Sequence, residues 1–268
     1  MGLGLYTKAS LVVGKPGVLA RPRTLTTDDL QRACSIFLAG TPLEEFKSFD
    51  RLWDGKPGFS LGFHPAEEGV DFHVDGNEVF VAAKTSSAGP GYHAMAVSLL
   101  DHLAKTLQVE WQFGGEHDEF QDEAGYFGDR DYKRLQDTFA NFMAQLFRMC
   151  LEKRKEGASG FRLGMPLDFG VILAEQEMQA IGAFTQLGPF GWAEIERGTS
   201  TKTKERDEMA ARYFPWWGEG FGADFLAKLG LLDMWMHQSW SAPSDERERK
   251  AMQRVLTWFE TARKLDPA

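Results

Sequence analysis

The strongest structural constraint in this sequence is a pair of alternating segments joined by a short turn. Between residues 70 and 84, apolar side chains occupy every second position on both sides of an Asp-Gly-Asn run at 75–77. Successive side chains of a β-strand point to opposite faces, so this period of two predicts two strands that share one apolar face. An Asp-Gly turn between such strands favours an antiparallel hairpin. Its apolar face has to be covered by other elements.

The period changes after a Gly-Pro-Gly run at 89–91. From residue 91 to residue 107, apolar residues recur three or four positions apart, which predicts an amphipathic helix. A longer stripe of the same kind extends over 130–155 and closes with Lys and Arg residues, which suit the negative end of a helix dipole. We therefore expect an antiparallel sheet that contains the hairpin and is covered by these two helices.

The rest of the chain completes the predicted fold class. A Gly-rich polar stretch at 156–164 precedes a region of short expected strands and then Trp-rich helical segments. The class is α+β: an antiparallel β-sheet packed by helices, with a mainly helical C-terminal part. Residues 1–268 fit a single domain, with a possible subdivision into a sheet-plus-helices part, 1–156, and a Trp-rich helical part, 157–268. In the second part, residues 221–240 are apolar on most sides, which predicts a buried helix.

The composition is that of a globular protein with an acidic surface. Of the 268 residues, 43% are hydrophobic, which is enough for a packed core, and the net charge is −9. This acidity disfavours direct binding to nucleic acids or anionic membranes and suits a basic protein partner. Cys34 and Cys150 match no metal-binding spacing and fit buried free thiols in a reducing compartment. The sequence shows no secretion signal and no apolar run of membrane length, so we expect a soluble cytoplasmic protein.

No complete catalytic motif is present. The sequence contains no Gly-x-Ser-x-Gly elbow and no recognisable Cys-His signature, and the run at 89–91 lacks the spacing of a nucleotide-binding loop. For the histidines other than His117, a structural role in a strand or on a helix face is the simplest interpretation. We therefore predict no catalytic residue, no cofactor and no resident metal.

The most unusual feature is an acidic segment at residues 110–131. It contains eight acidic residues and one basic residue, Arg130, so it contributes −7 to the chain's net charge of −9. One interpretation is a solubilising face, and another is a docking surface for a cationic partner. A third is a site for metal or acid–base chemistry at residues 116–119, which offer carboxylates and one imidazole. These residues lack the ligand spacing of calcium-binding or zinc-binding motifs.

Several short runs resemble one protein family. They are Gly89-Pro-Gly-Tyr92 at an expected helix start, Gly125-Tyr-Phe127 with Arg130-Asp-Tyr132, Phe214-Pro-Trp-Trp217, and Leu232-Asp-Met-Trp235 with Trp240 and Pro243. Together they resemble bacterial proteins classed as immunity protein 52, which are encoded beside polymorphic toxins. The resemblance covers most of the chain. It implies an α+β protein that neutralises, by binding, a toxin with a restriction-endonuclease-like domain, often delivered by type VI secretion, and it carries over no catalytic residues.

The resemblance and the charge pattern together give a partner and a docking site. The implied partner is a cognate toxin whose DNA-binding cleft is basic. The expected partner-binding residues are acids of the segment and the two aromatic residues beside them: Glu116, Asp118, Glu119, Asp122, Glu123, Tyr126 and Phe127. Two other classes of function stay open. One is a metal-dependent enzyme that uses the carboxylates of residues 116–123, and the other is an adaptor that loads an effector without inhibiting it.

Overall fold

The structure is a computed structural model that divides into two compact units. The first unit comprises Met1–Thr85 and Tyr92–Asp131, and the second comprises Ser86–Gly91 and Tyr132–Ala268. The main boundary lies between Asp131 and Tyr132, earlier in the chain than the possible subdivision after residue 156 that the sequence indicated. The described residues are 2–11, 25–52, 57–114, 120–158, 160–164, 181–237 and 243–267.

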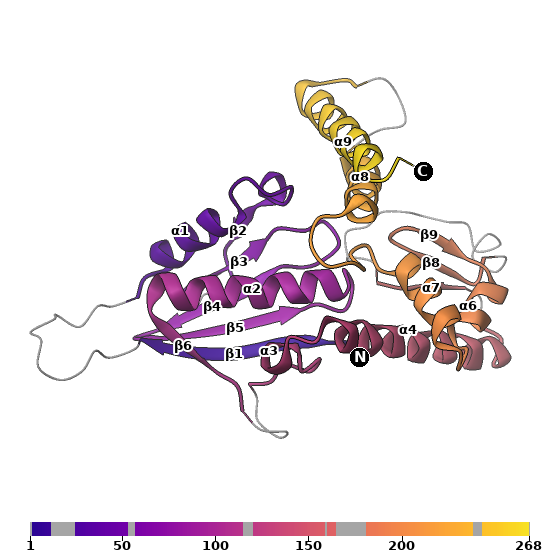
Figure 1. Cartoon of the computed structure of the whole chain (residues 1–268), viewed down its shortest axis with the longest axis horizontal. Helices are drawn as coiled ribbons and strands as arrows, with labels where there is room; N and C mark the ends of the chain where they lie inside the picture. Colours follow the sequence, from indigo (N-terminus) through magenta and orange to yellow (C-terminus); the bar gives the residue numbers. More distant parts are fainter. Residues whose placement is uncertain are drawn as a thin grey trace, which may run out of the picture. The chain divides into compact units, whose positions relative to one another are not determined.

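The first unit is built on an antiparallel sheet with strand order β2-β3-β4-β5-β1-β6 (Figure 1). Its elements are β1 (Gly4–Leu11), α1 (Thr27–Leu38), the 3-10 turn η1 (Glu44–Phe46), β2 (Ser48–Asp50), β3 (Gly58–Gly62), β4 (Val70–Asp75), β5 (Glu78–Lys84), α2 (Pro90–Leu107, whose first two residues belong to the second unit), β6 (Val109–Gln112) and α3 (Tyr126–Asp129). The predicted hairpin is confirmed, since β4 and β5 pair from Val70↔Ala83 to Asp75↔Glu78. Gly76 takes the first loop position with a φ of +59°, which a type II′ turn requires.

One face of this sheet is the core of the first unit. The strand pairing places buried residues of neighbouring strands side by side: Leu5 lies opposite Ala83, and Phe72 lies opposite Val81. The buried residues of this face are Leu5, Thr7, Ala9, Phe59, Leu61, Val70, Phe72, Val79, Val81 and Ala83. The predicted alternation therefore holds in the central strands, where the side chains on one face of the sheet are buried.

Helices α1 and α2 pack on this sheet (Figure 1). The indole nitrogen of Trp111 on β6 donates a hydrogen bond to the carbonyl oxygen of Leu100 on α2 at 2.7 Å. The ring of Phe37 on α1 lies 5.4 Å from the ring of His102 on α2. Every apolar residue of the predicted α2 stripe is buried: Tyr92, Ala96, Leu99, Leu100, Leu103 and Leu107. The predicted antiparallel sheet packed by helices is confirmed for this part of the chain.

The second unit is mainly helical in its described residues. Its elements are α4 (Tyr132–Lys155), β7 (Phe161–Arg162), β8 (Ala183–Thr185), β9 (Gly188–Phe190), α6 (Trp192–Gly198), α7 (Thr203–Tyr213), α8 (Ala223–His237) and α9 (Glu246–Leu265). The α+β class with C-terminal helices is thus confirmed. Helix α4 packs against α6 and α7 within this unit, and its expected packing on the sheet of the first unit stays a prediction.

The Gly-Pro-Gly run packs against the Phe-Pro-Trp-Trp run in the second unit. The backbone nitrogen of Trp216 donates to the Ala88 carbonyl at 2.8 Å, and the nitrogen of Gly91 donates to the Trp216 carbonyl at 3.0 Å. A β-carbon at Gly89 would lie 2.7 Å from Cβ of Phe214, and one at Gly91 would overlap the indole ring of Trp216. Two of the runs that carry the family resemblance are therefore in direct contact.

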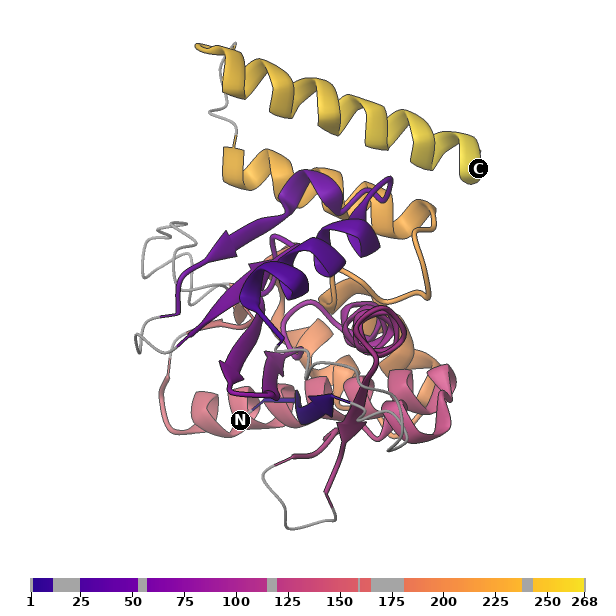
Figure 2. The same ribbon diagram turned by 90° about the vertical axis from the view of Figure 1, so that its left-hand side faces the viewer.

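Helices α8 and α9 form an antiparallel pair held by a buried ion pair (Figure 2). The carboxylate of Asp233 is fully buried and accepts two hydrogen bonds from the Arg254 guanidinium, at 2.8 and 2.7 Å. The prediction of a buried helix is only partly right, because Leu231 and Trp235 of α8 are 41% and 40% exposed. These two side chains lie one turn apart on the helix. Trp240 lies outside the described residues.

Two further expectations concern the cysteines and membrane-spanning helices. Cys34 and Cys150 are buried free thiols, as predicted. None of the helices in the described ranges combines the length and the apolar character that a membrane crossing requires.

Replacing Gly91 by Ala should destabilise the second unit. A β-carbon there overlaps the buried Trp216 indole, so we expect a loss of about 1–3 kcal/mol despite the better helix propensity of Ala. Gly218→Ala is the matched control, because its β-carbon would meet no atom within 4 Å, and it should change stability by less than about 0.5 kcal/mol. Urea unfolding measures both, and equal midpoints for the two variants would contradict the prediction.

Removing the partner of Asp233 should be costly. Arg254→Leu leaves a buried carboxylate without its guanidinium, which typically costs about 3–5 kcal/mol. The double variant Arg254→Leu/Asp233→Leu should regain most of this loss, because a matched apolar pair needs no charge compensation. Arg249→Leu, which breaks only an exposed pair with Glu246, should be near neutral. Thermal unfolding of the four proteins decides the matter, and a double variant no better than Arg254→Leu would refute this account.

Candidate functional site

The acidic segment follows one edge of the sheet. Strand β6 pairs with the second half of β1, from Lys8 to Leu11. After residues 115–119, which lie outside the described part, the chain returns and pairs with the first half of β1. Tyr6 donates its backbone N–H to the Gln121 carbonyl at 2.9 Å, and Glu123 donates to the Gly4 carbonyl at 3.2 Å. We call residues 120–131 the edge segment.

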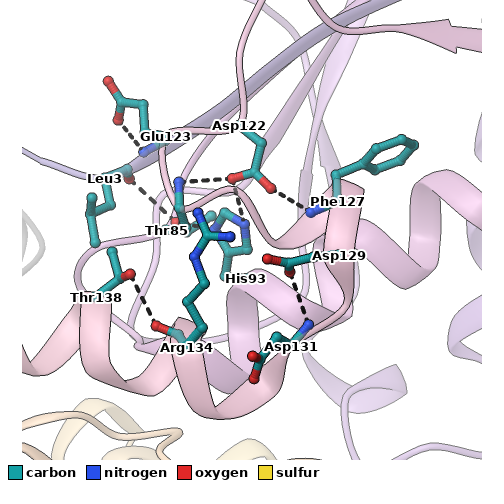
Figure 3. Close-up of polar contacts among 12 residues, drawn as sticks. Leu3, Thr85, His93, Asp122, Glu123, Phe127, Asp129, Asp131, Arg134 and Thr138 are labelled. Atoms are coloured by element: carbon teal, nitrogen blue, oxygen red, sulfur yellow. Dashed lines mark hydrogen bonds and ion pairs between the residues drawn. The ribbon is translucent and has the colours of Figure 1, made fainter.

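Asp122 turns its side chain into the protein rather than out to solvent (Figure 3). Only 6% of the side chain is exposed. One carboxylate oxygen accepts from the backbone nitrogen of Phe127 at 2.6 Å. The other accepts from the nitrogen of Ala124 at 2.9 Å and lies 3.1 Å from Nε2 of His93. This single carboxylate therefore shapes the turn between the sheet edge and α3.

His93 is fully buried on α2 and links Asp122 to the end of β5. Its Nδ1 lies 2.9 Å from the hydroxyl oxygen of Thr85. The Thr85 backbone nitrogen in turn donates to the Leu3 carbonyl at 2.9 Å. A carboxylate can only accept, so we infer that the Nε2 facing Asp122 carries a proton. The line Thr85–His93–Asp122 thus connects β5, α2 and the edge segment.

The surroundings of Asp122 favour its charged form. Burial would raise the pKa of this carboxyl, but the contact with His93 and the two backbone N–H groups outweigh burial and hold the pKa below its ordinary value. Asp122 is therefore ionised in the folded protein at neutral pH.

A hydroxyl, an imidazole and a carboxylate in line also raise the question of a nucleophilic triad. Thr85 and His93 are both 0% exposed, so no substrate can reach the Thr85 hydroxyl in this conformation. The geometry supports a buried structural network. Among the described residues, no group of three or more His, Cys, Asp or Glu side chains is placed to hold a metal ion.

The predicted partner-binding residues have different environments. Glu116, Asp118 and Glu119 lie outside the described residues. Asp122 and Tyr126 are buried, the latter with 8% exposure, so neither presents its side chain to a partner as expected from the sequence.

Glu123 and Phe127 are the more accessible members of the predicted set. Glu123 is exposed and accepts a hydrogen bond from the Gly4 nitrogen. Phe127 is half-buried, with its ring 4.1 Å from that of Phe113 and beneath the guanidinium of Arg130 at 4.7 Å. Phe127 therefore offers part of its ring at the surface while its backbone is fixed by Asp122.

The surface of the edge is acidic in its described part. Arg130 is paired with Asp101 at 2.9 Å, which offsets its charge. The exposed acids of the described part of the segment are what we call the acidic edge: Glu110, Glu123, Asp129 and Asp131. Glu110, Asp129 and Asp131 were not named individually as partner-binding residues, although they belong to the segment 110–131 that was interpreted as a docking surface.

Sequence reasoning gave His93 only a structural role and did not connect it with Asp122. The two residues are far apart in the chain, and nothing in the local pattern around either one indicates that they meet. Comparisons of the chain with protein-family models, curated proteins and solved structures give no match.

Neutralising Asp122 should weaken the fold in a pH-dependent way. Asp122→Asn keeps the size of the side chain and should cost about 1.5–3 kcal/mol of unfolding free energy at pH 7, because charged hydrogen bonds are lost. The folded pKa is lowered, so the stabilisation is complete above the unfolded pKa of about 3.9 and disappears as the pH falls through the folded value.

The difference in unfolding free energy between wild type and Asp122→Asn should therefore shrink below about pH 4. Urea unfolding at a series of pH values measures it. Glu110→Gln, a neutralisation of an exposed acid, should show almost no gap at neutral pH. A gap for Asp122→Asn that is constant from neutral to acidic pH would contradict the assigned role of the charge.

Proposed function

We propose that this chain is an immunity protein that binds and neutralises a cognate antibacterial toxin. The toxin is a nuclease effector delivered by type VI secretion, and the chain acts in the cytoplasm, where the nuclease would reach DNA. The proposal starts from the resemblance of several short runs to immunity protein 52. Two of those runs are in contact in the fold, and a third, Gly125-Tyr-Phe127, lies in the edge segment.

The observation that carries the proposal is the acidic edge. Its acids stand on a backbone held by strand pairing and by Asp122, so their backbone positions are set before a partner arrives. A preordered binding surface loses less conformational entropy on association. A nuclease cleft has to attract polyanionic DNA, and the same positive charge attracts this edge.

The burial of the side chains changes which residues we propose for docking. Glu123 and Phe127 keep the role predicted from the sequence, with Phe127 as the aromatic anchor. Glu110, Asp129 and Asp131 join them as exposed acids, and Glu116, Asp118 and Glu119 stay in the proposed surface. Asp122 and Tyr126 support the surface from below.

Both alternative classes can be tested against this proposal. For a metal-dependent enzyme based on residues 116–123, Asp122 is a poor ligand, since its side chain is 6% exposed and its oxygens already face two backbone N–H groups and His93. An adaptor would use the same surface but leave the toxin active. Protection of cells therefore separates neutralisation from loading.

Reversing charges on the acidic edge should slow toxin binding. We expect Glu110→Lys/Glu123→Lys/Asp131→Lys to reduce the association rate by about tenfold or more at low salt, because electrostatic steering is lost. The effect should shrink as salt rises, since salt screens exposed charges. Surface plasmon resonance against the inactivated toxin from the neighbouring gene measures it, and co-expression with the active toxin measures protection.

The matched control changes the same net charge elsewhere in the first unit. Asp50→Lys/Glu68→Lys/Asp75→Lys alters exposed acids away from the edge segment and should leave the association rate close to that of the wild type. Equal slowing by both triple variants would mean that net charge alone, and not the acidic edge, determines the association rate. Binding by the wild type without protection of cells would support the adaptor and refute neutralisation.

A further inference from the structure

The edge segment departs from the sheet after Glu123 and takes an irregular path. Gly125 has a φ of +73° and Arg130 a φ of +56°, both in the left-handed region. A non-glycine residue adopts this region only where its surroundings hold it there. Helix α3 between these two residues has no side-chain cap on its first residue. Local backbone hydrogen bonds support both residues, from Gly125 to the Asp122 carbonyl and from Arg130 to the Tyr126 carbonyl, and side-chain interactions add to them.

Asp122 supplies the main interactions at the start of this path. Its carboxylate accepts from the nitrogens of Ala124 and Phe127, which fixes the turn into α3. At the far end, Arg130 is held by Asp101 of α2. Phe127, Asp129 and Asp131 of the proposed docking surface all lie between or beside these two attachments.

The contact with His93 adds to these hydrogen bonds in favouring the inward position of Asp122. A carboxylate that is 6% exposed has lost most of its hydration, and two neutral N–H groups compensate a buried charge less well than an imidazole N–H at 3.1 Å does together with them. Without that imidazole, the favourable alternative is rotation of the Asp122 side chain to solvent. Such a rotation would release the nitrogens of Ala124 and Phe127 and free the segment.

We propose that His93 is a positioning residue for the toxin-docking surface: it holds Asp122 inside the protein and thereby keeps the edge segment in its binding conformation. This inference rests on the proposed function. His93 is fully buried, so its effect on binding is transmitted through Asp122. Loss of this contact lowers the fraction of molecules that can bind, and the apparent affinity falls by the same factor.

Hydrogen exchange followed by mass spectrometry tests the first step on the free protein. In His93→Leu, exchange of amides in the edge segment should rise about tenfold or more, while amides of β4 and β5 exchange as in the wild type. His93→Gln, which keeps an amide N–H near the position of Nε2, should restore much of the protection. His102→Leu, on the same helix, is the matched control and should leave the edge segment protected.

Binding kinetics test the second step. Against the inactivated toxin, at a temperature where every variant is folded, His93→Leu should associate about tenfold more slowly and His93→Gln should recover much of the rate. A purely structural role would change exchange uniformly in the first unit and leave the association rate of folded molecules unchanged, and either result would overturn the inference. If His93→Leu does not fold, Asp122→Ala, which removes the acceptor of the Ala124 and Phe127 nitrogens, is measured in its place with the same two outcomes.

The two proposals fail in different ways. A wild-type protein that does not bind the toxin overturns the proposed function and with it the docking role of His93. Wild-type binding together with an unchanged association rate in the folded His93 variants overturns only the positioning role.

Discussion

The contact between the carboxylate of Asp122 and the imidazole of His93 attaches the edge segment to the first unit, and the proposed function depends on this segment. It joins a helix that covers the sheet to the segment that runs along the sheet edge. Thr85 extends the same line to the end of β5. Polar groups buried in this way have to be satisfied, because an unpaired one costs more than the bond contributes when made. The network therefore selects one path for the chain between Glu123 and Asp131.

The acidic residues of this region divide into two roles that their chemistry alone does not distinguish. Asp122 is turned inward and shapes the backbone, whereas its neighbour Glu123 is exposed. The inward acid reduces the freedom of the outward ones, and ordered charges steer a partner without an added entropic cost on binding. Such a division explains how a strongly acidic segment can be part of a stable fold.

The second unit depends on close packing. Gly89 and Gly91 allow the backbone to approach Phe214 and Trp216, where any side chain would collide. The buried pair of Asp233 and Arg254 joins its last two helices. Leu231 and Trp235 on α8 are each about two-fifths exposed, so this helix is not buried on every side.

The sequence by itself determined the features that arise from local geometry. The alternation around Gly76 predicted β4 and β5, and the stripe after residue 91 predicted α2, because side-chain direction repeats every two residues in a strand and about every 3.6 in a helix. It also marked the acidic segment, since charge is read directly from composition.

Only the tertiary structure decided which acids face solvent and which histidine supports them. The pairing of His93 with Asp122, and the packing of Gly91 on Trp216, join residues that are distant in the chain. Burial is a property of the assembled fold, and an aspartate carries no local signal that says whether its side chain will point inward. The sequence therefore located the charged segment, while the fold assigned each carboxylate its role.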